Sequence, residues 1–388
     1  MSTKDVMGDA RKRFPIFRRL YKLSGNAIFG DGKTILYKTY SYISRVVVYL
    51  NWLAIVVDTI FNLNNLERLI ENVSVILPHL CSVWLDIFLQ FRKSSMEKIL
   101  METNMFAWED YPLRDEVTGW PTLRFVIVNV PKICFCNVWF TVISHSSYMV
   151  YRGVTSRDIL GFNAWFPFDS TLSPMHELVI AMQIYYSFMM TAHFYNNVAV
   201  YSTIVSIGCI QLNNLLKDIH SLQLDDLDDR KKKTKFKECV RYHQKILNYL
   251  GIMQDSLNVL MFGHFLIIII GMAFAAFSAV MSWQNLGAMF QLIVVFFGQM
   301  ILLAVYCILG THISTLTEDV RFAIYESDWI GSPVPTQKSM VFMMAAANNE
   351  FKLSAGGFIP VTRETMLAML NQMFSYTMFL LNFKDEEE

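Results

Sequence analysis

The sequence has little charge for a chain of its length. Only 17% of its 388 residues are Asp, Glu, Lys or Arg, whereas soluble domains carry about 25%. The formal net charge is zero, which excludes the basic surface expected of a nucleic-acid-binding protein. Hydrophobic residues make up 54% of the chain. This composition favours a protein that lies in a lipid bilayer.

The chain also lacks the motifs of nucleotide-binding and catalytic sites. It contains neither a Gly-x-Gly-x-x-Gly nor a Walker motif, and no serine or cysteine nucleophile is paired with a recognisable base. Cys134 and Cys136 are separated by one residue, and no histidine follows at zinc-binding spacing. We therefore expect no enzyme, no cofactor, no metal site and buried free thiols.

No cleavable signal peptide is expected, because the N-terminal residues are polar and basic. Residues 1–33 interleave basic side chains with Phe14, Phe17 and Tyr21. This pattern is typical of an amphipathic segment at a membrane surface, and it also fits a solvated basic tail.

Apolar runs dominate the rest of the chain, and seven of them predict helices that cross about 30 Å of hydrocarbon. They lie approximately at residues 36–61, 73–91, 125–150, 176–216, 257–281, 286–309 and 366–383. The fourth run is too long for one crossing, so its end should project beyond the membrane. We predict an all-α membrane protein with seven transmembrane helices, a charged loop at 217–245 and a separate amphipathic helix at 313–329.

The distribution of basic residues predicts the orientation. With a cytoplasmic N-terminus, 26 of the 33 Lys and Arg residues fall on the cytoplasmic side and four on the other side. The N-terminus should therefore be cytoplasmic and the C-terminus extracellular, opposite to a G-protein-coupled receptor. The glycosylation sequon at Asn72 should then face outward.

Four regions follow from this organisation. Residues 1–33 form the cytoplasmic amphipathic N-terminus, and 34–216 hold the first four helices with a ligand pocket in their outer half. Residues 217–356 hold the next two helices and cytoplasmic anchor helices. Residues 357–388 hold a pore-lining last helix and an acidic tail.

Clusters of aromatic, methionine and small polar residues mark the candidate pocket. The candidate ligand-binding residues are Tyr186, Met190, Met182, Tyr148, Ser144, Phe290, Gln291, Val294 and His79. From residue type alone, ordinary packing with an interfacial aromatic belt is the preferred explanation of these clusters. Asp86, seven residues after His79 on the same helix face, is about 10 Å from it and should find a partner on another helix.

The last helix carries one face of small and polar residues. Ser375, Phe379 and Asn382 recur three or four apart on that face. Such a stripe either packs against neighbouring helices or lines water.

Three segments of the chain resemble insect odorant receptors. They are LSAGGFIP at 353–360, which precedes the last helix, AIYESDW at 323–329, and NAWFPFD at 163–169, which is followed by Ser173 and Pro174. They occur in the family's order and at its spacing. A gustatory receptor of the same superfamily is the nearest alternative, and a transporter would need an inverted repeat, which is absent.

This resemblance implies a ligand-gated, non-selective cation channel of four subunits in the plasma membrane of a sensory dendrite. The chain would be a tuning subunit, since its loop after the fourth helix is short, and would work with the co-receptor Orco. A small, volatile, mostly apolar odorant would bind in the outer half. Phe379 would lie at the gate, where the family often has a short aliphatic residue, and Asn382 at the adjacent polar ring.

The helix before residue 330 supplies the candidate subunit interface. Phe322, Tyr325 and Trp329 are spaced three or four apart on it. We expect these side chains to be buried between subunits on the cytoplasmic side.

Overall fold

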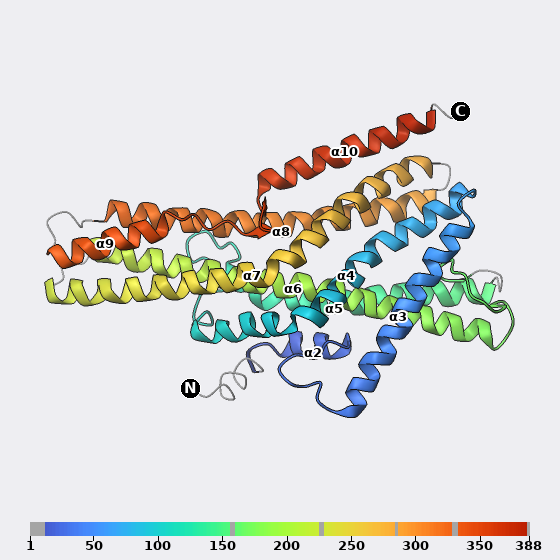
Figure 1. Cartoon of the computed structure of the whole chain (residues 1–388), viewed down its shortest axis with the longest axis horizontal. Coiled ribbons are helices and arrows are strands. Elements are labelled where there is room, and N and C mark those ends of the chain that lie inside the picture. The colour runs from blue at the N-terminus through green and yellow to red at the C-terminus, as the bar shows by residue number, and fades with distance from the viewer. Residues whose placement is uncertain (1–11, 156–159, 225–228, 284–285, 328–332, 386–388) are drawn as a thin grey trace.

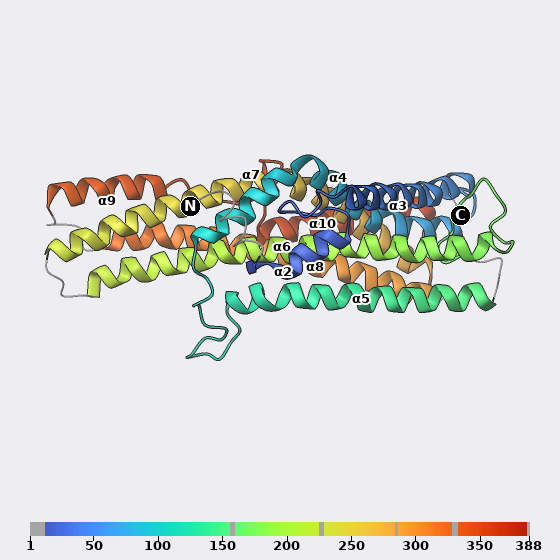
Figure 2. The same ribbon diagram turned by 90° about the horizontal axis from the view of Figure 1, so that it is seen from below.

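The computed structural model describes residues 12–155, 160–224, 229–283, 286–327 and 333–385. It is an elongated bundle of helices, most of which run along its long axis (Figures 1 and 2). The elements are α2 (Pro15–Leu23), α3 (Ile35–Phe61), α4 (Leu66–Glu102), η1 (Thr103–Met105), α5 (Leu123–Thr155), α6 (Met175–Leu224), α7 (Asp229–Met281), α8 (Leu286–Glu326), α9 (Val334–Ala347), β1 (Ser354–Ala355), β2 (Ile359–Pro360) and α10 (Arg363–Asp385).

Six of the described helices are able to cross a membrane by their length and composition: α3, α4, α5, α6, α7 and α8. The last helix, α10, is not among them, because polar residues such as Asn371, Gln372 and Asn382 interrupt its apolar side chains. The six apolar helices match six of the seven runs in the sequence. The seventh crossing stays a prediction.

The prediction of a loop at 217–245 is wrong for residues 217–224 and 229–245, which are helical, and residues 225–228 lie outside the described residues. The helix α6 continues through 50 residues to Leu224, and α7 starts at Asp229. The sequence from 211 to 250 contains no proline or glycine, so the charged residues in its described parts lengthen the two helices instead of ending them. The amphipathic helix expected at 313–329 is likewise the end of the continuous helix α8.

The core lies where α6, α7 and α8 pack together. Tyr201, Tyr249 and Tyr306 are fully buried there, and each hydroxyl is satisfied. Tyr201 donates to the Tyr306 carbonyl at 2.8 Å, and Tyr249 donates to the Ile204 carbonyl at 2.8 Å. The Asn197 amide donates to the Tyr306 hydroxyl at 2.7 Å. These hydrogen bonds offset the cost of burying polar atoms.

The N-terminal segment packs against protein. Phe17, Leu20 and Tyr21 of α2 are buried, and α2 contacts α5 and α6. Arg13 donates to both carboxylate oxygens of Glu109 at 2.6 Å. Burial raises the pKa of Glu109, but the hydrogen bonds and charge of Arg13, together with hydrogen bonds from the backbone amides of Glu109 and Trp108, lower the pKa overall. The apolar face that suggested a membrane surface therefore covers the bundle.

A two-stranded hairpin fixes the start of α10. Strands β1 and β2 are antiparallel, and Gly356 and Gly357 between them have φ of +67° and +80°, a conformation that favours glycine. The Gln254 side chain of α7 bonds both the amide and the carbonyl of Ser354, at 2.9 and 3.0 Å. Val361, which follows the hairpin, is fully buried. These contacts hold the hairpin against α7.

On the other side the hairpin abuts α8 at Gly310. A Cβ at Gly310 would lie 2.2 Å from the Val361 carbonyl oxygen, which is backbone and has no rotamer to change. A Cβ at Gly251 of α7 would meet no atom of the described residues within 4 Å. Packing against the segment after the hairpin therefore requires glycine at 310 but not at 251, so Gly251 can serve as the control for Gly310.

We predict that Gly310→Ala destabilises the full-length chain by about 1–3 kcal/mol, because the segment after the hairpin must move away from α8. Gly251→Ala, its control, should stabilise the chain by about 0.5–1 kcal/mol through helix propensity. Thermal unfolding of the purified chain in detergent measures both. Equal unfolding temperatures for the Gly310 variant and the wild type would contradict this packing.

Candidate functional site

An aromatic cluster joins α4, α6 and the loop before α6. His79 of α4 lies edge-on to Tyr186 of α6, with ring centroids 4.9 Å apart, and the Tyr186 hydroxyl lies 2.9 Å from His79 Nδ1. Phe162 of the loop is edge-on to both rings, at 5.7 Å from His79 and 6.0 Å from Tyr186. The three rings thus combine an apolar surface with one polar pair.

The loop that carries Phe162 is held by its backbone. The Gln183 side chain accepts from the Phe162 amide at 3.0 Å and donates to the Phe162 carbonyl at 2.9 Å. Farther along, the Trp165 amide donates to the Ala54 carbonyl of α3 at 3.0 Å. Because both ends are tied to helices, Phe162 keeps a defined position against Tyr186.

Met190 extends the aromatic cluster along α6. It is buried in the same hydrophobic group as Tyr186, Met189 and Val83, and its carbonyl accepts a hydrogen bond from Ser82 of α4 at 2.9 Å. The sequence-predicted residues Tyr186, His79 and Met190 are thereby brought to one α4–α6 contact.

Two turns farther along the same helices lies a buried charge, Asp86. Its side chain is buried, and Nε2 of His193 lies 3.3 Å from one carboxylate oxygen. Nε of Arg45 on α3 lies 3.4 Å from the other oxygen. Tyr49 and Asn26 also donate to Asp86. The expectation that Asp86 finds its partners on other helices is confirmed.

The Tyr186–His79 and His193–Asp86 contacts form a ladder of two side-chain pairs between α4 and α6. His79 and Asp86 are seven residues apart on α4, and their partners Tyr186 and His193 are seven apart on α6. Seven residues correspond to about 10 Å along a helix. The equal spacing means that α4 and α6 run side by side in register. The aromatic cluster therefore lies seven residues from the buried charge on each helix.

The remaining predicted pocket residues lie elsewhere. Met182 is half-buried on α6, whereas Ser144 and Val294 are exposed on the surface of the single chain. The side chains of Tyr148, Phe290 and Gln291 lie outside the described residues. A shared pocket for the whole set stays a prediction.

Sequence reasoning did not select Phe162 as a ligand contact. This residue directly precedes the NAWFPFD segment, so that motif was the available signal. The partners of Asp86 at Asn26 and Arg45 carried no such signal, because they are 60 and 41 residues away in the chain.

The candidate pore and interface residues are surface residues of the single chain. Ser375, Phe379 and Asn382 are all exposed on α10, and Phe379 is 64% exposed. Phe322 and Tyr325 are exposed at the end of α8, Tyr325 by 69%. Trp329 lies outside the described residues.

In the described part of the chain, no group of three or more His, Cys, Asp and Glu side chains is placed to hold a metal ion. The cysteines are all free, and only Cys136 among them is exposed. The buried cysteine at 239, which was expected in a loop, lies within α7.

Known proteins resemble the chain along most of its length. A family profile described as 7tm Odorant receptor matches residues 68–374. Odorant receptor 47b of Drosophila melanogaster is 22% identical over 299 residues, which cover 74% of this chain and 71% of that receptor. Odorant receptor 30a of the same fly is 20% identical over 337 residues, covering 82% of this chain and 85% of that receptor.

A solved structure has the same fold. It is the insect olfactory receptor OR5 from Machilis hrabei in complex with eugenol, with a TM-score of 0.69 and 16% sequence identity. The match covers 97% of this chain and 99% of that one.

The contacts around Asp86 predict that loss of its charge lowers the free energy of unfolding. Asp86→Asn preserves the side-chain shape but leaves Arg45 without a counter-charge, and we expect it to lower the free energy of unfolding by about 3 kcal/mol. Asp110→Asn, an exposed position in the loop after η1, is the control and should change stability by less than about 0.5 kcal/mol. Thermal unfolding of the two variants in detergent compares them, and equal midpoints would refute a stabilising role for the charge.

Proposed function

Because this chain belongs to the 7tm odorant receptor family, we propose that it is the odorant-tuning subunit of an odorant-gated cation channel. It is a receptor and a multi-pass membrane protein of that family. We infer that it binds a small, volatile, mostly apolar odorant and opens a non-selective pore together with a co-receptor subunit. The observation that carries this proposal is the family match across residues 68–374.

The aromatic cluster is the proposed odorant contact. The Tyr186–His79 pair supplies one polar contact, and the rings of Phe162 and Tyr186 supply an apolar wall. Such a lining suits a ligand with an apolar or aromatic body and one hydrogen-bonding group. Met190 and Met182 add deformable side chains to the same helix. The OR5 structure of Machilis hrabei contains eugenol, so eugenol belongs in any test panel.

The helix α10 is the proposed pore lining. Its large apolar side chains, including Phe374 and Phe379, are exposed in the single chain, an arrangement that other subunits would cover in an assembly. Ser375 and Asn382 would then face the ion path, with Phe379 at the constriction. A cation channel requires polar groups of this kind beside a hydrophobic gate.

The end of α8 and the helix α9 are the proposed subunit interface. Phe322 and Tyr325 on α8 and Val341 and Phe342 on α9 are exposed, Phe342 by 76%. Exposed apolar side chains on two adjacent helices support a partner chain on this face. We assign Trp329 to the same interface from its spacing. The partner is the co-receptor, and the assembly is a tetramer.

The proposed setting is the plasma membrane of a sensory dendrite, with a cytoplasmic N-terminus and an extracellular C-terminus. The distribution of basic residues supports this orientation. The end of α6, the start of α7, the end of α8 and the helix α9 would then form the anchor in the cytoplasm.

Whole-cell currents from cells that express the chain with and without the co-receptor test the proposed function. Odorants should evoke inward current only with both chains present. We expect Tyr186→Phe to change the rank order of an odorant panel, with sensitivity shifts of about fivefold for ligands that use the hydroxyl. Tyr42→Phe, an exposed position on α3, is the matched control.

Uniform scaling of all odorants by Tyr186→Phe at normal surface levels would refute the contact assignment. Absence of odorant-evoked current from any combination of chains would refute the channel itself.

Glycosylation tests the orientation. The native sequon residue Asn72 is 2% exposed and donates to Asp58 at 2.8 Å, so we expect it to carry no glycan. Asp169→Asn creates a sequon with Thr171 in the exposed loop before α6 and should add one glycan if that loop is extracellular. A glycosidase shift on gels reads both outcomes, and a modified wild type or an unmodified Asp169 variant would contradict them.

A further inference from the structure

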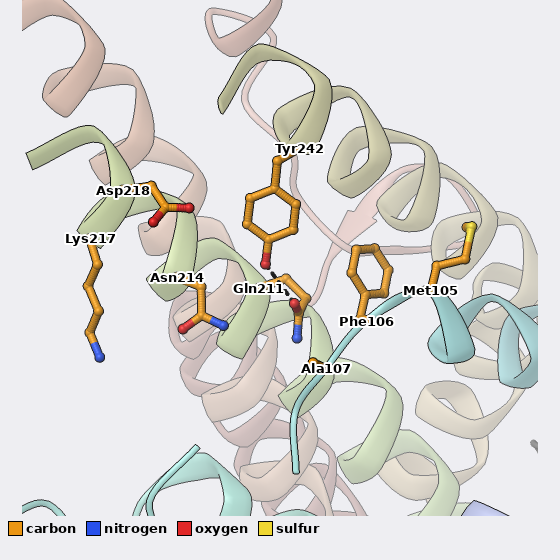
Figure 3. A pocket seen from close by; sticks show the side chains of 8 residues that line it. All are labelled: Met105, Phe106, Ala107, Gln211, Asn214, Lys217, Asp218 and Tyr242. Atoms are coloured by element: carbon orange, nitrogen blue, oxygen red, sulfur yellow. Dashed lines mark hydrogen bonds between the residues drawn. The ribbon is translucent and has the colours of Figure 1, made fainter. Parts of the chain in front are cut away.

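A cavity lies far from the aromatic cluster. Its volume is about 420 Å³, and its walls come from the end of η1 with the residues after it, from α6 and from α7 (Figure 3). Gln211 of this cavity follows Tyr186 by 25 residues on α6, a separation of about 38 Å along the helix. The cavity is therefore not part of the proposed odorant site.

A buried amide marks the floor of the cavity. Gln211 is 1% exposed, and its side-chain oxygen accepts a hydrogen bond from the Tyr242 hydroxyl at 2.7 Å. Its side-chain nitrogen, Nε2, is buried and has no hydrogen-bond partner among the described residues. A buried N–H group without a partner is unfavourable, so an acceptor atom of a ligand would satisfy it.

Two opposite charges border the same cavity. Lys217 and Asp218 are consecutive on α6, so their side chains diverge, as Figure 3 shows. Nζ of Lys217 lies 5.0 Å from the centre of the Tyr111 ring. One cation and one anion give a lining of zero net charge, which disfavours ligands with several charges of one sign.

The remaining wall is apolar and held in place. The rings of Phe106 and Tyr242 lie 6.5 Å apart, and Met105 is beside them. Arg13 donates to the carbonyl oxygens of Thr103 and Phe106 at 2.7 and 2.8 Å, which anchors this loop from outside the cavity. A preformed wall lowers the entropic cost of binding.

We propose that this cavity binds a small zwitterion with an apolar body. Its oxyanion would accept from Gln211 Nε2 and pair with Lys217, its ammonium group would pair with Asp218, and its body would pack against Phe106. The volume lies within the usual range of about 300–1,000 Å³ for small-molecule sites.

The position of the cavity along α6 indicates a water-soluble source for this ligand. Gln211 lies about 54 Å along the helix from Met175, well beyond the thickness of about 30 Å of a hydrocarbon core. A free amino acid with an apolar side chain fits this site better than the headgroup of a bilayer lipid.

Equilibrium binding to the purified full-length chain in lipid nanodiscs tests the proposal without odorant or current. The probe is L-phenylalanine, and its matched analogues are 3-phenylpropanoate, which lacks the ammonium group, and phenethylamine, which lacks the carboxylate. We expect saturable binding of phenylalanine and at least about tenfold weaker binding of each analogue. Dihexanoylphosphatidylcholine forms a second arm, and tighter binding of this lipid than of phenylalanine would assign the zwitterion to a lipid source.

Substitutions in the lining locate the binding. Gln211→Leu and Lys217→Met should each weaken binding by about tenfold, whereas Lys237→Met, an exposed position of α7 outside the cavity, should not. Lys217 is exposed, so its variant decides the test even if the Gln211 variant does not fold. Absence of saturable binding by either probe, or binding unchanged in Lys217→Met, would overturn the proposal.

Discussion

The burial of one carboxylate, Asp86, constrains the arrangement of the helices around it. A charge in a low-dielectric interior is tolerated only when opposite charges and hydrogen-bond donors surround it. Its partners come from the segment after α2, from α3 and from α6, through Asn26, Arg45, Tyr49 and His193. Apolar packing alone permits helices to slide and repack, whereas a shift that separates a buried ion pair leaves a charge without a partner and is therefore disfavoured. Four parts of the chain are therefore positioned relative to one another by a single side chain.

The register set at Asp86 has a consequence for the proposed odorant site. Seven residues from Asp86 on α4, the same alignment brings His79 to the Tyr186 hydroxyl of α6. The two hydrogen bonds between the Gln183 side chain and the Phe162 backbone place Phe162 beside both rings. Under the proposed function, an odorant that enters this cluster must separate side chains of α4 and α6. These two helices are held together at the neighbouring contact between Asp86 and His193. The ends of α4 and α6 on the His79 side would then move, and the contact at Asp86 would stay closed. Separating the buried ion pair is the more costly change.

Sequence patterns predicted part of this arrangement and failed in identifiable places. Long apolar runs identified α3 to α8, since about 20 apolar residues have few other stable structures. The charged segment at 217–245 was assigned to a loop because charge was weighed above helix propensity, yet its described residues, which include no proline or glycine, are helical. The spacing of His79 and Asp86 correctly excluded a direct pair between them. It did not reveal Arg45 or Asn26 as partners, because contacts between distant segments leave no local pattern.

The sequence by itself determined that this is a helical membrane protein of the odorant receptor family, because composition, hydrophobic run length and three motifs are properties of consecutive residues. Only the tertiary structure decided which side chains meet. Tyr186 and His79 are 107 residues apart, and Gln211 and Met105 are contributed by different helices to one cavity. Such contacts depend on helix register and rotation about the helix axis, and both are set by the sum of many packing and polar interactions across the whole fold.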